Sequence, residues 1–274
     1  MDEPQPHQKK TARTVASFFK SPWFDTLQFL LLVAILCFIA IKSSEDIGYF
    51  WQWYQIPQYI YTIDEGVFTP GPLLEGLVIT IKISAISLFF SFFIGLTTAI
   101  FRLSNSFIAR SLATFYLEIS RNTPLLIQIF FIYFVLGPTM GIERFASAVL
   151  ALSLFEGAYA SEIFRAGIQS VDKGQIEAAK SVGLSTFHTY RFVILPQAVR
   201  TILPPLTNQA ISLIKDSALV STIAVYDLTL QAQNLVAETY LTFELWFTVA
   251  LLYLSITLIL SLIVDIMEKR FKLQ

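Results

Sequence analysis

The chain has 274 residues, of which 55% are hydrophobic and 14% charged, and its formal net charge is -1. Soluble domains average about 25% charged residues, so this composition indicates a protein whose main solvent is lipid, and it offers no basic surface for nucleic acid. A single cysteine, Cys37, excludes an internal disulfide, and with two distant histidines we expect no metal site.

The N-terminal region combines a basic tail, an apolar run and an aromatic-rich segment. Residues 1–23 contain four basic residues and are expected to form a cytoplasmic tail. The apolar run at residues 24–41 has no small-residue cleavage site after it, so we expect a retained transmembrane anchor rather than a cleaved signal peptide. Residues 42–72 are expected to be periplasmic. Their tyrosines and tryptophans favour a short helix on the outer membrane surface over an aromatic ligand cage.

Six apolar segments approach the length of about 20 residues that a membrane-spanning helix needs. They are Phe24 to Ile41, Leu74 to Phe101, Pro124 to Leu136, Phe145 to Ile168, Pro204 to Val225, and Phe243 to Met267. The third is short, and we expect Ala109 to Arg121 to extend it into one helix bent near Pro124. The pair Pro204-Pro205 removes two backbone donors, so the helix entering the fifth segment is expected to break there.

The basic residues predict the orientation of these segments. With the N-terminus inside, 15 of the 19 lysines and arginines lie in cytoplasmic segments and two, Lys42 and Arg144, lie outside. Lys82 and Lys215 fall within apolar segments. Because cytoplasmic loops are enriched in Lys and Arg, we expect both termini to be cytoplasmic.

One cytoplasmic stretch between spans is long enough to contact another protein. Residues 171–193 read VDKGQIEAAKSVGLSTFHTYRFV, in which Gln175 to Val182 predicts about two helical turns that end at Gly183. Ala178 and Ala179 lack bulk, so another protein surface could approach this helix closely. From the residues alone, an ordinary connecting loop is an equal alternative.

The same stretch resembles the EAA motif of permease subunits of ATP-binding cassette (ABC) importers, E-A-A-x3-G-x9-I-x-L-P. Glu177, Ala178, Ala179 and Gly183 match it, and Val193 replaces the usual isoleucine before Leu195-Pro196. The resemblance implies that a coupling helix at about residues 175–187 sits in a groove of an ATPase subunit.

Further segments are similar to those of polar amino-acid permeases. They are RNTPLLIQ at residues 121–128, GAYASEIFRAGI at 157–168, and KDSAL at 215–219, which departs from K-D-T-S-L at Ser217 and Ala218. The resemblance covers residues 73–269 and implies an all-α integral membrane protein with six transmembrane helices, namely a five-helix type I importer core and one N-terminal helix.

The chain lacks an ATPase site of its own. A phosphate-binding loop requires G-x-x-x-x-G-K-[ST], and although Gly71 and Gly76 have the right spacing, Leu77 stands where lysine is needed. We therefore expect a translocation subunit that is not an enzyme and carries no cofactor, with ATP and Mg bound by partner ATPase subunits.

Ionisable residues inside apolar segments are functional suspects because they are costly to insert. Glu156 and Glu162 project about 120° apart on one helix. Glu162 either pairs with Arg165, one turn away, or binds a substrate ammonium. Lys215 and Asp216 either contact a zwitterionic substrate or form a structural network. The substrate-binding candidates are Gln128, Tyr133, Glu162, Lys215, Asp216, Ser217 and Ser221.

Together these features predict the permease subunit of an ATP-driven importer of polar amino acids in the bacterial cytoplasmic (inner) membrane, working by alternating access. The resemblance implies ATPase subunits, a second identical or related permease subunit, and a periplasmic or extracellular amino-acid-binding protein as partners. The alternative is an ATP-independent secondary transporter or channel for small polar solutes, which an internal twofold repeat would favour. No such repeat is evident.

Overall fold

The computed structural model of the chain describes residues 22–46 and 48–272, so most of the expected cytoplasmic tail lies outside the described residues. Two compact units, residues 1–51 and 52–274, are considered separately. In the first, α2 (Pro22–Asp46) confirms the predicted N-terminal helix. Its described apolar stretch is Thr26–Ile35, and its crossing of the membrane stays a prediction.

Three helices in the described part of the second unit are long and apolar enough to cross a bilayer. They are α4 (Pro72–Leu103), α8 (Arg144–Gln169) and α13 (Thr242–Lys272), and they confirm three of the predicted segments within a few residues. Helix α4 packs along α8, where small residues allow a close approach. A Cβ on Gly95 would lie 2.8 Å from the Cβ of Ala160, and one on Gly157 would lie 2.8 Å from Ile94. Such contacts of small residues are typical of packed membrane helices.

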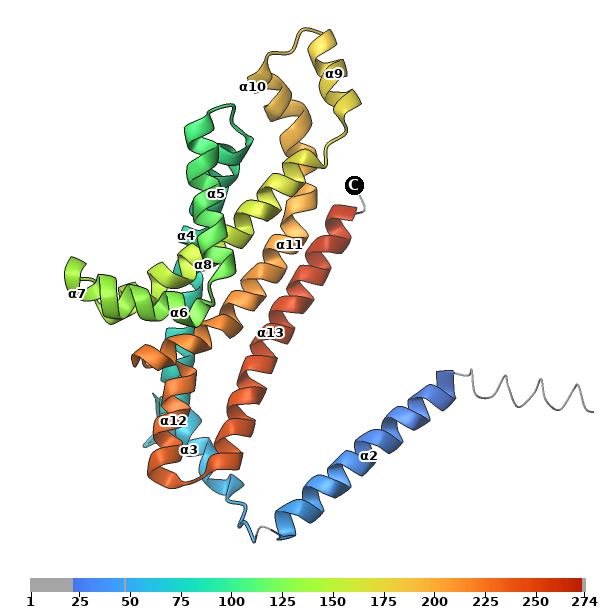
Figure 1. Cartoon of the computed structure of the whole chain (residues 1–274). Coiled ribbons are helices and arrows are strands. Elements are labelled where there is room, and N and C mark those ends of the chain that lie inside the picture. Colours follow the sequence, from blue (N-terminus) through green and yellow to red (C-terminus); the bar gives the residue numbers. More distant parts are fainter. Residues whose placement is uncertain (1–21, 47, 273–274) are drawn as a thin grey trace, which may run out of the picture. The chain divides into compact units, whose positions relative to one another are not determined.

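The third predicted segment is sharply broken. Helix α5 (Phe107–Asn122) is followed by Thr123 and Pro124, after which α6 (Leu125–Phe130) continues through the π-helical turn η2 (Phe131–Leu136) into α7 (Gly137–Met140). The two arms meet at 109° across Thr123 and Pro124, and Figure 1 shows α6 and α7 running sideways from the end of α5. The predicted bend near Pro124 is confirmed, but it lies at a break between two helices and not within one long helix. The two arms count as one span only if a broken span is allowed.

The fifth predicted segment differs from expectation at both ends. Helix α11 (Leu195–Asp216) begins nine residues before Pro204 and runs through Pro204-Pro205, and the 3-10 turn η4 (Ser217–Ile223) follows it. The predicted break at the prolines is therefore wrong. The prolines lack the N–H groups that would bond to the carbonyls of Arg200 and Thr201, and both of these residues are exposed. Close packing of Ile202 against Gly167 of α8 holds this part of α11 in place.

Opposite ends of the second unit carry two different structures (Figure 1). At one end lie α9 (Lys173–Ser181), α10 (Thr186–Thr189) and the π-helical turn η3 (Tyr190–Ile194). At the other end lie η1 (Trp53–Gln55), α3 (Ile56–Ile60), a hairpin of β1 (Tyr61–Asp64) and β2 (Val67–Pro70), and α12 (Leu228–Thr239). The expected surface helix in the aromatic segment is thus short, and a hairpin that was not expected follows it.

Candidate functional site

Helix α9 ends as the sequence predicts. Gly183 has φ +83°, a conformation that glycine adopts without a Cβ penalty. The N–H of Gly183 donates to the Lys180 carbonyl at 3.0 Å, and the N–H of Leu184 donates to the Ala179 carbonyl at 3.1 Å. This pair of bonds is a Schellman motif, which stops the helix and turns the chain towards α10.

The two alanines of α9 face different surroundings. Glu177 and Ala178 are exposed, whereas Ala179 is only 6% exposed and packs inside its own chain. The expectation that both alanines leave room for another protein therefore needs correction, because successive helical residues point about 100° apart. Ala178 of α9, Val182 just after it and Phe187 of α10 are exposed, Val182 by 78%.

The segment of residues 171–194, which contains α9, is fixed to two membrane helices. Val171 and Ile194 are buried with Phe164 of α8 and with Ala198 and Ile202 of α11. In addition, the Gln197 side chain of α11 donates to the Gln175 side chain of α9 at 2.6 Å. These contacts connect the segment to α8 and α11.

Glu162 lies among three arginines. One of its oxygens accepts from Arg102 of α4 and lies 3.4 Å from Arg121 of α5, and the other accepts from Arg165 at 2.7 Å. The intrahelical pairing with Arg165 that the sequence allows is present, and two further arginines join it. The side chain is 23% exposed, so these ions are partly solvated. The sequence signal that could have placed Arg102 and Arg121 near Glu162 is that both lie near the ends of helices.

Glu156 has the opposite environment. The residue is 1% exposed, and one carboxyl oxygen accepts from the Gln209 side chain of α11 while Oε1 has no hydrogen-bond partner in the structure. The Asp216 carboxyl lies within hydrogen-bond reach of Glu156, so a proton shared by the two carboxyl groups, or a cation, would complete this arrangement. Sequence reasoning noted Glu156 as an intramembrane charge but left it out of the binding candidates, and no sequence signal identified Gln209.

The side chains of three other binding candidates already form hydrogen bonds within the chain. The Gln128 amide donates to the carbonyls of Ser120 at 2.8 Å and Thr123 at 2.9 Å, which holds the bend between α5 and α6. The hydroxyls of Ser217 and Ser221 are buried and donate to carbonyls of their own turn, each at 2.7 Å.

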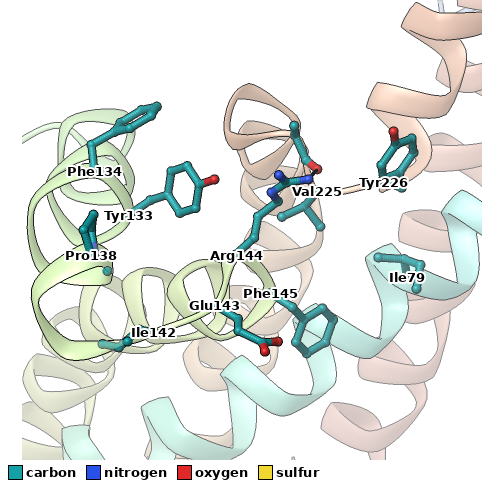
Figure 2. A pocket seen from close by; sticks show the side chains of 13 residues that line it. Ile79, Tyr133, Phe134, Pro138, Ile142, Glu143, Arg144, Phe145, Val225 and Tyr226 are labelled. Carbon is teal, nitrogen blue, oxygen red and sulfur yellow. Dashed lines mark hydrogen bonds between the residues drawn. The ribbon is translucent and has the colours of Figure 1, made fainter.

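A pocket of about 750 Å³ lies between the η2–α7 arm, the start of α8 and the end of η4. Figure 2 shows the Tyr133 ring pointing into it, while Arg144 extends to the turn beside Val225. The Arg144 guanidinium donates to the carbonyl of Ala224 at 2.9 Å. Ala224 has φ +56°, so this arginine holds a left-handed turn at the end of η4.

The structure thus divides the candidates among several places. Tyr133 lines the pocket of Figure 2, Glu162 belongs to the arginine cluster, and Asp216 lies beside Glu156. Lys215 is exposed on α11.

Comparison with known proteins identifies the family to which this chain belongs. The model of the family "Binding-protein-dependent transport system inner membrane component" matches residues 91–273. The chain belongs to this family.

Two curated relatives and one solved structure illustrate the match. The glutamine transport system permease protein GlnP of Escherichia coli strain K12 is 41% identical over 204 residues, covering 73% of this chain and 93% of GlnP. The nopaline transport system permease protein NocM of Agrobacterium fabrum is 39% identical, covering 72% of this chain and 86% of NocM. The crystal structure of an amino acid ABC transporter with histidines superposes with a TM-score of 0.69 at 38% identity, covering 73% of this chain and 94% of that one.

The inner membrane component therefore has the type I ABC importer permease fold, as the EAA motif predicts. Its transport step depends on ATP-binding partners, since the ATPase activity of such systems lies in separate subunits.

Proposed function

We propose that this inner membrane component is the permease subunit of an ATP-driven importer of amino acids. Its similarity to glutamine and nopaline permeases and to an amino acid ABC transporter supports this cargo class. The observation that carries the proposal is α9, a capped helix with one open face that is locked to α8 and α11. An ATPase subunit seated on that face would move both membrane helices.

The proposed orientation places α9 in the cytoplasm. The basic residues Arg102, Arg110, Lys173 and Lys180 belong to α4, α5 and α9, and the turn between α4 and α5 lies at the same end of the second unit as α9 (Figure 1), as the positive-inside rule requires. With α2 as an additional span, both termini are cytoplasmic, and the hairpin end faces outwards. A second permease subunit, identical or related, would complete the translocation path. ATP and Mg would be bound by the ATPase subunits and not by this chain.

Glu156 is the proposed contact for a substrate ammonium. Its unpartnered oxygen is buried beside Asp216, and a carboxylate in such a place is stabilised by a cation. Lys215, exposed one residue before Asp216, would be available to a substrate carboxylate. Glu162 is assigned a structural role, because three arginines already surround it.

The neighbouring alanines of α9 provide the test. A178E changes the open face of α9 and leaves the chain's own packing intact, so we expect normal assembly with ATP hydrolysis uncoupled from uptake. A179E places a charge in a buried position and should destabilise the permease itself, since an unpaired buried charge costs several kcal/mol. Thermal stability of the purified permease, ATPase rate and amino-acid uptake are measured on both variants in proteoliposomes with the ATPase subunits.

Coupled uptake at the wild-type rate in a stably folded A178E variant would contradict the proposal. The ATP-independent alternative makes a different prediction, namely uptake by the permease alone, driven by an ion gradient. Membership in a binding-protein-dependent family argues against that alternative.

A further inference from the structure

The hairpin at the end opposite α9 has a defined fold. Tyr61 pairs with Pro70, Ile63 with Phe68 and Asp64 with Val67, so the turn consists of Glu65 and Gly66. Both turn residues have positive φ, 51° and 83°, as in the two-residue turn that suits twisted hairpins. The matched family region begins at residue 91, so the hairpin precedes it.

The base of the hairpin is rigid. The N–H of Gly71 donates to the Ile60 carbonyl at 2.8 Å, and a Cβ on Gly71 would lie 2.5 Å from the Tyr59 carbonyl. Ile56 of α3 is buried with Leu73 of α4 and Leu228 of α12. The hairpin is therefore held at a fixed place on the molecule.

One face of the hairpin is apolar and uncovered. Tyr61, Ile63 and Phe68 share this face, and they are 44%, 62% and 57% exposed. The rings of Tyr61 and Phe68 stack at 5.8 Å. A hairpin alone is only marginally stable in water, and contiguous exposed apolar side chains mark contact surfaces.

The surroundings of this face are acidic. Residues 52–76 and 224–246 contain six carboxylates and no lysine, arginine or histidine, and the Arg144 guanidinium reaches the first of these residues from the second stretch, Ala224. Asp227 and Glu244 are buried, whereas Asp64, Glu65, Glu75 and Glu238 are exposed. Anionic lipid headgroups attract basic segments and repel acidic ones, so this charge argues against the membrane as the occupant.

We propose that the hairpin is a docking surface for the binding protein of this transport system. The matching surface of that protein would carry lysines or arginines around an apolar centre. This inference rests on the proposed function, which places the hairpin end outside. Complementary charge at the edge of such an interface mainly speeds association and makes it sensitive to salt.

The test uses the full permease with its ATPase subunits in phosphatidylcholine nanodiscs, titrated with the amino-acid-loaded binding protein that supports uptake. The double variant D64N/E65Q should raise the half-maximal concentration for ATPase stimulation about tenfold at low salt, with the maximal rate unchanged. At 0.5 M salt the half-maximal concentration of the double variant should exceed that of the wild type only about twofold, since the Debye length becomes a few ångströms. The single variant F68S should raise the same concentration about equally at both salt concentrations, since it removes apolar contact.

The matched control is D265N, which removes an exposed charge near the other end of α13. Wild-type half-maximal concentrations in both hairpin variants would overturn the docking surface. Loss of maximal rate alone would overturn it too, because a docking contact acts on affinity. If no amino-acid-loaded binding protein stimulates the wild-type complex, the proposed function fails instead.

Discussion

Two glutamates of α8 lie six residues apart, about 9 Å along the helix, and have opposite surroundings. Glu162 is partly exposed and meets three arginines from α4, α5 and α8. Glu156 is almost fully buried, has Gln209 as its hydrogen-bond partner, and keeps one oxygen unpaired. Glu162 was one of the seven binding candidates expected from the sequence and Glu156 was not, whereas the proposed substrate contact is Glu156.

The difference shows that a carboxylate paired with cations and a buried carboxylate with an unpaired oxygen indicate different roles. A carboxylate whose lone pairs are taken by guanidinium groups is already neutralised and connects helices. A buried carboxyl oxygen without a partner is costly, and such an arrangement persists at places where a ligand or proton completes it. The comparison predicts that replacing Glu156 impairs transport more than stability, and that replacing Glu162 does the reverse.

The largest expected effect is that of E156Q. Glutamine keeps the volume and the contact with Gln209 but loses the charge, so uptake should fall at least tenfold, which corresponds to about 1.4 kcal/mol of transition-state stabilisation. The melting temperature should stay unchanged or rise, because a buried ionisable oxygen is removed. Initial uptake rates in proteoliposomes and thermal unfolding in detergent provide the two measurements.

The control for E156Q is S153A, one turn away on the same helix. Ser153 is buried and its hydroxyl donates only to the Val149 carbonyl of its own helix, so uptake should remain normal. A stable E156Q variant with wild-type uptake would remove Glu156 from the transport path.

The second prediction concerns E162Q, which leaves three guanidinium groups without their shared anion. We expect a loss of about 1–2 kcal/mol of unfolding free energy, a modest figure because the side chains are partly solvated. The loss should be larger at low salt, where repulsion among the arginines is screened least. Uptake should fall only a few-fold. Unfolding in detergent at two salt concentrations, with uptake, measures the effect.

R121Q is the matched control, because Arg121 lies 3.4 Å from Glu162 and is the most exposed arginine of the cluster. It should destabilise less than E162Q. If E162Q instead abolished uptake at unchanged stability, Glu162 would be the substrate contact and the comparison would be reversed.

Local chemistry explains what the sequence could predict. The length of the apolar segments predicted α4, α8 and α13, because a helix must be long and apolar to cross the lipid bilayer. Gly183 predicted the end of α9, since a left-handed residue favours glycine. The orientation of α9 was not predictable in this way. Whether Ala178 or Ala179 faces its own chain depends on packing against α8 and α11.

The missed features depend on contacts between distant residues. Pro124 marked a break, but the 109° angle is held by Gln128 donating to Ser120 and Thr123. Proline content predicted a break in α11, but the helix is continuous, and Ile202 packs closely against Gly167 of α8. The environment of Glu156 depends on Gln209, which is 53 residues away in the chain.

Asp227 sharpens the comparison because it repeats the arrangement of Glu156 outside the membrane-spanning helices. It is fully buried, its Oδ1 caps α12 by accepting from the N–H of Leu230 at 2.9 Å, and its Oδ2 is unpaired. Burial raises the pKa of the Asp227 carboxyl to about 6, so the folded state binds a proton that the unfolded state releases near pH 3.8. The stability of the wild type relative to D227N should therefore fall as pH rises from about 4 to about 6 and stay constant above that.

Among E156Q, E162Q and D227N, the last should have the smallest effect on transport. Asparagine keeps the cap, so D227N should show near-normal uptake, whereas D227A should be about 1 kcal/mol less stable than D227N at every pH because the cap is gone. Thermal unfolding of the three forms between pH 4 and 7.5, with uptake at pH 7, tests both statements. If D227N impaired uptake as strongly as E156Q, an unpaired buried oxygen would mark structural sensitivity rather than a transport contact, and Glu156 would lose its special status on α8.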